Sequence, residues 1–290
     1  MAVQKRKKTL SHGRPPSSRP KERMTAERSR TIIRTHHTLQ KDHAAALRKG
    51  DLKTAAILAQ KIEENGGIKM YQAASKQGQA KDRGGDSSKV LIDWLVQAQV
   101  IDAHTRDRKA SKGTPLKCLE VGALSTKNEI SRFPSIIDMQ RIDLNSQGPG
   151  IEKQDFMERP LPSNEGERFD ILSLSLVLNY VPDAVGRGEM LKRITKFLRK
   201  PSAQTESSSP MLPALFFVLP LPCIDNSRYF DEELLLRIMK ALGFIMRYNK
   251  HTTKLCYYFF TLTDGSTSTK FQKKKIRDKP TMNNFAIVVE

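Results

Sequence analysis

Two residues in the middle of the chain, Gly122 and Asp143, have the types and the spacing that bind a nucleoside. Gly122 follows the apolar run Leu116–Val121, and a glycine there lets the backbone turn sharply and approach a ligand closely. Asp143 ends the next apolar stretch, where a carboxylate can accept hydrogen bonds from both ribose hydroxyls. In dinucleotide folds the acid follows the glycine turn by about 20 residues, and here it follows by 21. The pair predicts a ribose site; the alternative is an aspartate that caps its own loop through Asn145.

Three further residues near this pair could complete a cofactor site. Glu120 stands two positions before the glycine, where it would fix the turn or meet a cationic part of the ligand; alternatively, it is a strand residue that faces solvent. Asp155 and Phe156 close the following apolar segment. A carboxylate there can hold the exocyclic amine of an adenine while the phenyl ring stacks on the base. The alternative is an ordinary loop aspartate.

The glycine turn also discriminates between cofactors. A pyrophosphate needs several glycine amides at a helix N-terminus, whereas Gly122 is followed by Ala123-Leu124-Ser125. A single close approach of the backbone suits an amino-acid-bearing adenosine, such as S-adenosylmethionine, better than NAD. No His/Cys pair has the spacing of metal ligands, so we expect no metal site.

A polar loop, Leu178-Asn179-Tyr180-Val181-Pro182-Asp183, ends a later apolar run. It loosely resembles the Asn/Asp-Pro-Pro-Tyr loop of amino-group methyltransferases, in which an amide and a backbone carbonyl hold the target nitrogen and an aromatic ring stacks on the base. On that resemblance, Asn179 and Tyr180 are the candidate catalytic residues. The alternative is a turn from strand to helix, in which Pro182 breaks the strand and Asp183 caps the helix.

The elements that must position these residues alternate between strand and helix over residues 113–265. We expect strands at residues 116–121, 136–144, 151–156, 169–178 and 215–219, helices at 126–133, 188–198 and 231–242, and a final strand pair at 244–248 and 255–262. The alternation predicts an α/β fold with a mostly parallel sheet and helices on both faces. The carboxyl ends of the strands would bring Gly122, Asp143, Asp155 and Asn179 to one rim. The antiparallel end pair suits a seven-stranded methyltransferase sheet better than a dehydrogenase.

The N-terminal part of the chain is strongly basic. The net charge is +19, and residues 1–50 contain 14 Lys and Arg against 3 Asp and Glu. We expect residues 1–35 to be a disordered tail, because they have too little apolar surface to offset the entropy of ordering. The charge predicts a polyanionic partner, foremost nucleic acid, and the tail indicates a nuclear or nucleolar address that contacts RNA. The alternative is a merely solvated tail.

Residues 36–112 are expected to form a helical extension. Apolar spacing over residues 36–64, broken at Gly50-Asp51, predicts a hairpin of two helices, and residues 89–103 predict an amphipathic helix with Trp94 in the core. Residues 66–79, which contain Tyr71 and Gln72, form either a lid over the cofactor site or a capped helix start. Residues 266–290 are expected to be a basic C-terminal segment, with a lysine-rich run at 270–279 and a short strand at 285–289.

Several classes of protein do not fit the sequence. No segment approaches 18 consecutive apolar residues, and no apolar region of a signal peptide follows the basic N-terminus, so we expect no membrane partner. The three cysteines, Cys118, Cys223 and Cys256, are far apart. They are typical of reduced, buried thiols in an intracellular protein.

Six short blocks, taken together, carry a family resemblance. They are Met70-Tyr71-Gln72-Ala73-Ala74-Ser75, Gly85-Asp86-Ser87-Ser88, Leu119-Glu120-Val121-Gly122, Arg141-Ile142-Asp143-Leu144-Asn145, Gln154-Asp155-Phe156 and Ser175-Leu176-Val177-Leu178-Asn179-Tyr180-Val181-Pro182. Over about residues 65–290 the chain closely resembles the fungal nucleolar methyltransferases that make N1-methyladenosine in 25S rRNA. The basic tail matches only in its charge.

The resemblance implies a class I, Rossmann-like, seven-stranded methyltransferase that uses S-adenosylmethionine during ribosome biogenesis. It implies Gly122 and Asp143 as cofactor contacts, large-subunit rRNA or a pre-ribosomal particle as the partner, and the nucleolus as the location; we expect a monomer. The family also resembles an animal protein that binds S-adenosylmethionine as a sensor. A non-catalytic sensor and a ribosome-assembly factor are therefore alternatives, although a sensor would not need a charge of +19.

Overall fold

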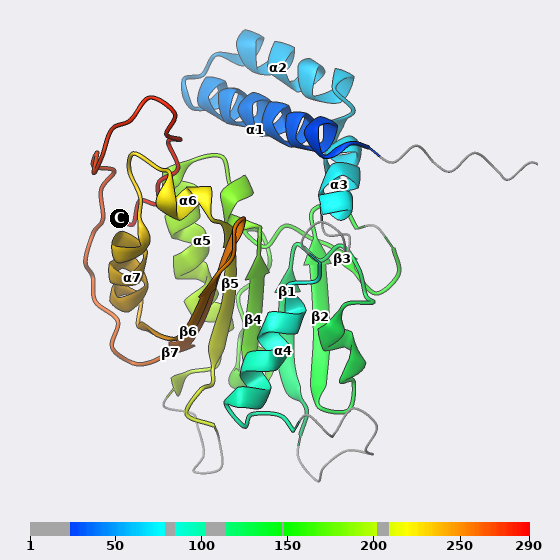
Figure 1. Ribbon diagram of the computed structural model, residues 1–290, viewed down its shortest axis with the longest axis vertical. Helices are drawn as coiled ribbons and strands as arrows, with labels where there is room; N and C mark the ends of the chain where they lie inside the picture. The colour runs from blue at the N-terminus through cyan, green and yellow to red at the C-terminus, as the bar shows by residue number, and fades with distance from the viewer. Residues whose placement is uncertain (1–23, 79–84, 103–113, 147, 202–208) are drawn as a thin grey trace, which may run out of the picture.

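The computed structural model describes residues 24–78, 85–102, 114–146, 148–201 and 209–290 of the chain. At its centre is a seven-stranded sheet with the order β3-β2-β1-β4-β5-β7-β6 (Figure 1). Strands β1 to β5 run parallel to one another, and β7 is antiparallel to both of its neighbours. The strands are β1 (Leu116–Val121), β2 (Ile137–Asp143), β3 (Glu152–Lys153), β4 (Ile171–Ser175), β5 (Ala214–Pro220), β6 (Phe244–His251) and β7 (Leu255–Leu262). The architecture confirms the predicted seven-stranded methyltransferase fold.

Helices cover both faces of the sheet, because successive strand residues point to opposite sides. Leu119 belongs to the core shared with α5 and α7, whereas its neighbour Cys118 belongs to the core shared with α4. Trp94 lies in the second core, with its ring centroid 6.0 Å from that of Phe216, and is the core anchor that the sequence predicts. The helices that follow the N-terminal extension are α4 (Ser88–Gln97), η2 (Glu129–Arg132), η3 (Glu165–Glu167), η4 (Leu178–Tyr180), α5 (Ala184–Phe197), α6 (Pro222–Asp225) and α7 (Glu232–Ala241).

Three N-terminal helices lie above the carboxyl edge of the sheet: α1 (Ala26–Arg48), α2 (Leu52–Glu64) and α3 (Gly67–Gly78) (Figure 1). The first two form the predicted hairpin. Gly50 makes the break with a φ of 71°, and the Asp51 side chain caps α2 by accepting a hydrogen bond from Thr54 N. The helical extension therefore stands directly over the rim where the sequence places the cofactor residues.

Helix α1 begins at Ala26, within the stretch that the sequence suggests is a disordered tail through residue 35. Thr25 Oγ1 accepts a hydrogen bond from Arg28 N over 3.1 Å and caps the helix. The helix packs on α2 and α3. Its first turns lack an apolar stripe, and most helical stability in proteins comes from tertiary packing, which the local sequence does not reveal. The rest of the expected tail, residues 1–23, lies outside the described residues.

The C-terminal segment is built into the core rather than appended to it. Residues 285–289 are buried, but they pair with the chain only through single bridges such as Phe271 to Val289, so the expected short strand is not formed. Val288 O lies against α5 at Gly188, where an added Cβ would come within 1.8 Å of it. Arg187 Nη1 donates to Ala286 O over 2.8 Å. This docking holds the lysine-rich run before it in a defined place.

Candidate functional site

A cavity of about 1810 Å³ lies between the N-terminal helices and the strand ends of the sheet. Pockets for one small molecule usually have about 300–1,000 Å³, so this cavity has room for a cofactor and a second ligand group. Every site residue that the sequence predicts lines it: Glu120, Gly122, Asp143, Asp155, Phe156, Asn179 and Tyr180.

Gly122 makes the turn after β1 in a conformation that favours glycine. Its φ of 75° lies in the left-handed region, and its amide donates to Ile142 O over 2.9 Å. An added Cβ would come within 2.4 Å of Val177 Cγ2. A side chain here would therefore strain the turn and displace the loop that follows β4.

Asp143 is held at the end of β2 by its own loop and by helix α3. Its Oδ1 accepts hydrogen bonds from Asn145 N over 2.8 Å and from Gln72 Nε2 over 2.7 Å. The first bond is the loop cap that the sequence allows as an alternative to ribose binding. The cap does not exclude a ribose site, because a carboxylate has about four acceptor positions and Asp143 also lines the cavity.

Glu120 is enclosed by partners rather than directed to solvent. Its carboxylate accepts two hydrogen bonds from Asn128 Nδ2, over 3.0 and 3.1 Å, and lies 3.4 Å from Arg141 Nε. Desolvation by burial is the largest influence on this group and raises the pKa of Glu120. The surface-facing alternative is therefore wrong, and the contacts tie the residue to the segment that follows the glycine turn.

Asp155 and Phe156 differ in what they can offer a ligand. Asp155 Oδ1 accepts a hydrogen bond from Met157 N over 2.7 Å, and the residue is partly exposed at the cavity. Phe156 is only 2% exposed, and its ring centroid lies 5.0 Å from that of Phe197 in the core. A ring that is packed on its neighbours has no face to give to an adenine, so the stacking role predicted for Phe156 does not fit its position.

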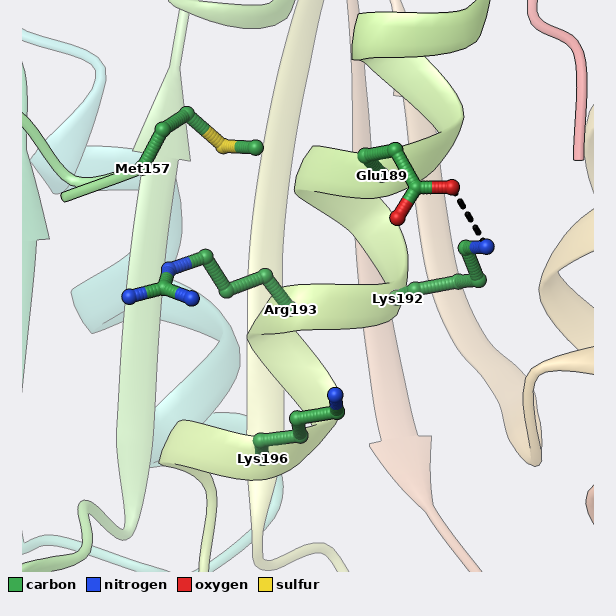
Figure 2. A pocket seen from close by; sticks show the side chains of 5 residues that line it. All are labelled: Met157, Glu189, Lys192, Arg193 and Lys196. Atoms are coloured by element: carbon green, nitrogen blue, oxygen red, sulfur yellow. Dashed lines mark ion pairs between the residues drawn. The ribbon is translucent and has the colours of Figure 1, made fainter. Parts of the chain in front are cut away.

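A second, smaller hollow lies along α5 (Figure 2). It has a volume of about 180 Å³ and is lined by Met157, Glu189, Lys192, Arg193 and Lys196. Arg193 Nε donates to Phe156 O over 2.9 Å, and Glu189 is paired with Lys192. The hollow is too small for a nucleoside cofactor, and Arg193 supports the wall of the main cavity from behind.

The loop after β4 contains a residue with a positive φ and a buried side-chain amide oxygen that has no hydrogen-bond partner among the described residues. Leu176 has a φ of 57°, in the left-handed region that a leucine rarely adopts. Asn179 Oδ1 is buried and has no hydrogen-bond partner among the described residues. Asp183 Oδ1 accepts a hydrogen bond from Gly186 N over 2.9 Å and begins α5, as the structural alternative for this loop predicts. The loop is therefore both a helix start and a wall of the cavity.

Aromatic rings from the N-terminal helices reach this loop. The ring of Tyr71 meets that of Tyr180 edge-on, with centroids 5.0 Å apart. The imidazole of His36 stacks on Tyr71 at 4.8 Å. His36 is buried, and this desolvation lowers its pKa, which favours the neutral imidazole near pH 7. The Tyr71-Gln72 segment is thus a helix whose side chains contact the site, which the sequence leaves undecided.

The segment before α4 also belongs to the site, although the sequence does not place it there. Asp86 and Ser87 line the cavity. Ser88 N donates to Asp86 Oδ1 over 2.9 Å, so Asp86 caps the helix start. Ser87 Oγ lies 2.9 Å from Ser175 Oγ at the end of β4. In the sequence, this segment is marked by its local density of glycine and hydroxyl residues and by its place among the blocks of the family resemblance.

Within the described ranges, no helix combines the length and apolarity needed to cross a membrane. Among the same residues, no group of three or more His, Cys, Asp or Glu side chains is placed to hold a metal ion. The three cysteines are buried and unpaired, and burial raises the pKa of Cys223 to about 12. Thiolate chemistry is therefore disfavoured at that residue.

Two relatives match most of the chain. The 25S rRNA (adenine(2142)-N(1))-methyltransferase of Saccharomyces cerevisiae is 37% identical over 260 residues, which cover 87% of this chain and 70% of the relative. The 25S rRNA adenine-N(1) methyltransferase of Schizosaccharomyces pombe is 37% identical over 263 residues, which cover 88% and 89%. A solved structure of a Burkholderia thailandensis 1,6-didemethyltoxoflavin-N1-methyltransferase with S-adenosylhomocysteine matches 67% of this chain and 87% of its own, at 15% identity and a TM-score of 0.41.

A protein-family model matches residues 56–287, which include α3, the glycine turn and the loop after β4. Its description is 25S rRNA (adenine(2142)-N(1))-methyltransferase, Bmt2. This description is of an enzyme, and it decides against the two non-catalytic alternatives. The chain therefore belongs to the Bmt2 family and is an S-adenosylmethionine-dependent rRNA adenine-N1 methyltransferase.

Proposed function

We propose that the cavity at the strand ends is the site of methyl transfer, with the cofactor at the ends of β1, β2 and β3 and the target adenine at the loop after β4. The observation that carries this proposal is the buried Oδ1 of Asn179, which has no hydrogen-bond partner in the described parts of the chain and belongs to the same cavity as Asp143. A buried acceptor without a partner costs about 1–3 kcal/mol. A ligand amine in the cavity would remove that cost.

The strand ends have the chemistry that S-adenosylmethionine requires. Gly122 has no side chain to keep a ligand from the backbone. Asp143 offers a carboxylate to the ribose hydroxyls, and Asp155 offers one to the exocyclic amine of the cofactor adenine; both line the cavity. When bound, the cofactor supplies an electrophilic methyl group on a sulfonium. Glu120 supports the cofactor site indirectly, because its contacts with Asn128 and Arg141 hold the segment that follows the glycine turn.

The target half must hold an adenine by its Watson–Crick edge. N1 already carries a lone pair in the plane of the ring, so no general base is needed, and catalysis is mostly orientation and desolvation. Asn179 Oδ1 would accept a hydrogen bond from the exocyclic amine beside N1, and the ring of Tyr180 would contact the base. Because a paired adenine hides N1, the base must be unpaired or flipped into the cavity.

The proposed route for the RNA passes a basic strap, which we define as residues 270–279. Its lysines at 270, 273, 274, 275 and 279 are exposed. Arg277 Nε donates to Ser227 O over 2.7 Å, and Asn283 Nδ2, just beyond the strap, donates to Pro222 O over 2.6 Å. Pro222 and Lys254 line the cavity. The strap therefore lies on the side of α6 (Figure 1), close to the cavity, where lysines can neutralise phosphates of an entering strand.

The cellular setting follows from the substrate. The enzyme acts in the nucleolus, where its basic N-terminal residues support both import and RNA contact. A monomer is sufficient for this activity, because the residues proposed for cofactor and target line one cavity of a single chain. Its substrate is large-subunit rRNA, either free or within a pre-ribosomal particle.

The test is methyl transfer in a purified system. The protein is incubated with radiolabelled S-adenosylmethionine and large-subunit rRNA from cells that lack it, and the labelled nucleoside is identified after digestion. We expect N1-methyladenosine from the native chain and from Asn249→Leu, a control at an exposed amide in β6. Asp143→Ala should reduce both transfer and cofactor binding, and Asn179→Leu transfer alone. Full transfer by both variants would place the site elsewhere.

A further inference from the structure

Gln72 has a buried side-chain amide, and both its nitrogen and its oxygen form hydrogen bonds at the proposed cofactor site. The residue is 3% exposed. Its Nε2 donates to Asp143 Oδ1 over 2.7 Å and to Asn145 O over 3.0 Å. Its Oε1 accepts from Asn145 Nδ2 over 2.8 Å. A buried amide of this kind is costly unless it is fully paired, and here its partners are the predicted ribose carboxylate and the loop that carries it.

The geometry of this network is a closed ring of hydrogen bonds. Asn145 N also donates to Asp143 Oδ1, over 2.8 Å, so Gln72 and Asn145 hold the same carboxylate oxygen from two directions. The torsion that turns a carboxylate is otherwise soft. Two donors on one oxygen fix the plane of the group, and a bond from an amide to a charged carboxylate is among the stronger hydrogen bonds.

We infer that Gln72 is a positioning residue of the cofactor site: it orients the Asp143 carboxylate for the ribose hydroxyls of S-adenosylmethionine. This inference rests on the proposed function of the cavity. It makes helix α3 a part of the site rather than only a cover. A side chain that binds a ligand must have its rotamer fixed by its neighbours. For Asp143, Asn145 does this from the same loop and Gln72 does it from helix α3.

Gln72 is not needed merely to attach helix α3. Tyr71 on the same helix contacts Tyr180, and α3 packs against α1 and α2. Replacement of the Gln72 amide should therefore leave the helix in place while freeing the Asp143 carboxylate. This separation allows the positioning role to be measured apart from a structural one.

The first experiment titrates the full chain with S-adenosylhomocysteine by calorimetry, without RNA. Gln72→Met keeps the side-chain volume but not the donors, and we expect affinity to fall by about tenfold. Gln72→Glu sets a second carboxylate against Asp143 and should cost more. Gln60→Met is the matched control, since Gln60 is an exposed amide in α2 that donates to Glu64 on the same helix, and the affinity of this variant should not change.

The second experiment asks whether the loss acts through the ribose. The analogue of S-adenosylhomocysteine that lacks both ribose hydroxyls should bind equally well to the native chain and to Gln72→Met. Likewise, Gln72→Met should add nothing to the loss caused by Asp143→Asn. An equal loss for both ligands, or additive losses, would show that Gln72 only supports the fold and would overturn the inference.

The outcomes separate this inference from the proposed function. If Asp143→Asn weakens binding but Gln72→Met does not, the cofactor site stands and the role of Gln72 is wrong. If neither variant changes affinity for S-adenosylhomocysteine, the assignment of Asp143 fails, and the inference fails with it.

Discussion

The two halves of the cavity are stabilised in different ways. At the ends of β1 and β2, Asn128 donates to Glu120, which also forms an ion pair with Arg141, and both Asn145 and Gln72 donate to Asp143. At the loop after β4, by contrast, Leu176 has a left-handed backbone and the buried Asn179 Oδ1 has no partner among the described residues. In the proposed division of the cavity, the cofactor half is preorganised, while the buried oxygen in the target half costs about 1–3 kcal/mol, which a ligand amine would relieve.

This difference predicts opposite effects of mutation on stability and on activity. Polar groups in the cofactor half contribute to the fold as well as to binding, since they tie the strand ends and α3 together. Strained or unpaired groups in the proposed target half should lower stability, as such groups do at many functional sites. One variant in each half can therefore test whether the two halves differ in their contribution to stability.

The largest effect is expected for Asn179→Leu, which removes the unpaired acceptor without a large change in volume. Transfer to rRNA should fall by about 100-fold or more, because a target amine would lose its acceptor. The free energy of unfolding should stay level or rise by about 1 kcal/mol, because a buried unpaired oxygen is gone. Single-turnover kinetics and denaturant melts measure the two effects. A variant that is less stable yet fully active would reverse the comparison.

Asp143→Ala is the matching change in the cofactor half. Affinity for S-adenosylmethionine should weaken by about 1–3 kcal/mol, because the ribose would lose charge-assisted hydrogen bonds. Stability should fall as well, since Gln72 and Asn145 lose their shared acceptor. Calorimetric titration and thermal unfolding check both. Unchanged affinity would remove Asp143 from the site, and unchanged stability would mean that the two halves do not differ as described.

Gly122→Ala tests the glycine turn by its effect on the stability of the fold, without any ligand. A non-glycine residue in the left-handed region costs about 1–2 kcal/mol, and the new Cβ would press on Val177, which lies 2.4 Å from its ideal position. We expect a lower melting temperature even without cofactor. A larger change such as Gly122→Arg should lose binding and stability together, so a loss of binding there is not specific evidence for a cofactor contact. An unchanged melting temperature for Gly122→Ala would contradict the strained turn.

The meeting of Gly122 and Asp143 at one cavity could be predicted from the sequence because its signals are local. A strand, a glycine and an acid 21 residues later each reflect the chemistry of a few neighbouring positions. The sheet order brings these strand ends together by rule, because β1 pairs with both β2 and β4. Phe156 is the exception, because residue type does not reveal which way a ring turns at the end of a strand.

The rest of the site depends on long-range contacts that no local pattern contains. Gln72 meets Asp143 across 71 positions in the sequence, and Tyr71 reaches Tyr180 from the same helix. The early start of α1 was missed for a related reason, since its polar first turns are held by packing on other helices. The sequence allows the Tyr71-Gln72 segment to be either a lid or a helix start, and only the fold shows what each side chain contacts.

The smallest expected effect concerns the basic strap and separates RNA binding from cofactor binding. Lys274→Ala should weaken rRNA binding slightly and lower the slope of log affinity against log salt by about 0.7–0.9 if the lysine neutralises one phosphate. Lys275 Nζ lies 2.9 Å from Asp278 Oδ2. Because that carboxylate already neutralises the ammonium group, Lys275→Ala should change the slope less. Neither variant should alter the affinity for S-adenosylmethionine, because the strap contacts α6, where Arg277 donates to Ile224 O, rather than the ends of β1 and β2. Filter binding over a salt series measures whether Lys274→Ala changes the slope more than Lys275→Ala. Equal slopes for both variants and the native chain would exclude the strap from the RNA path.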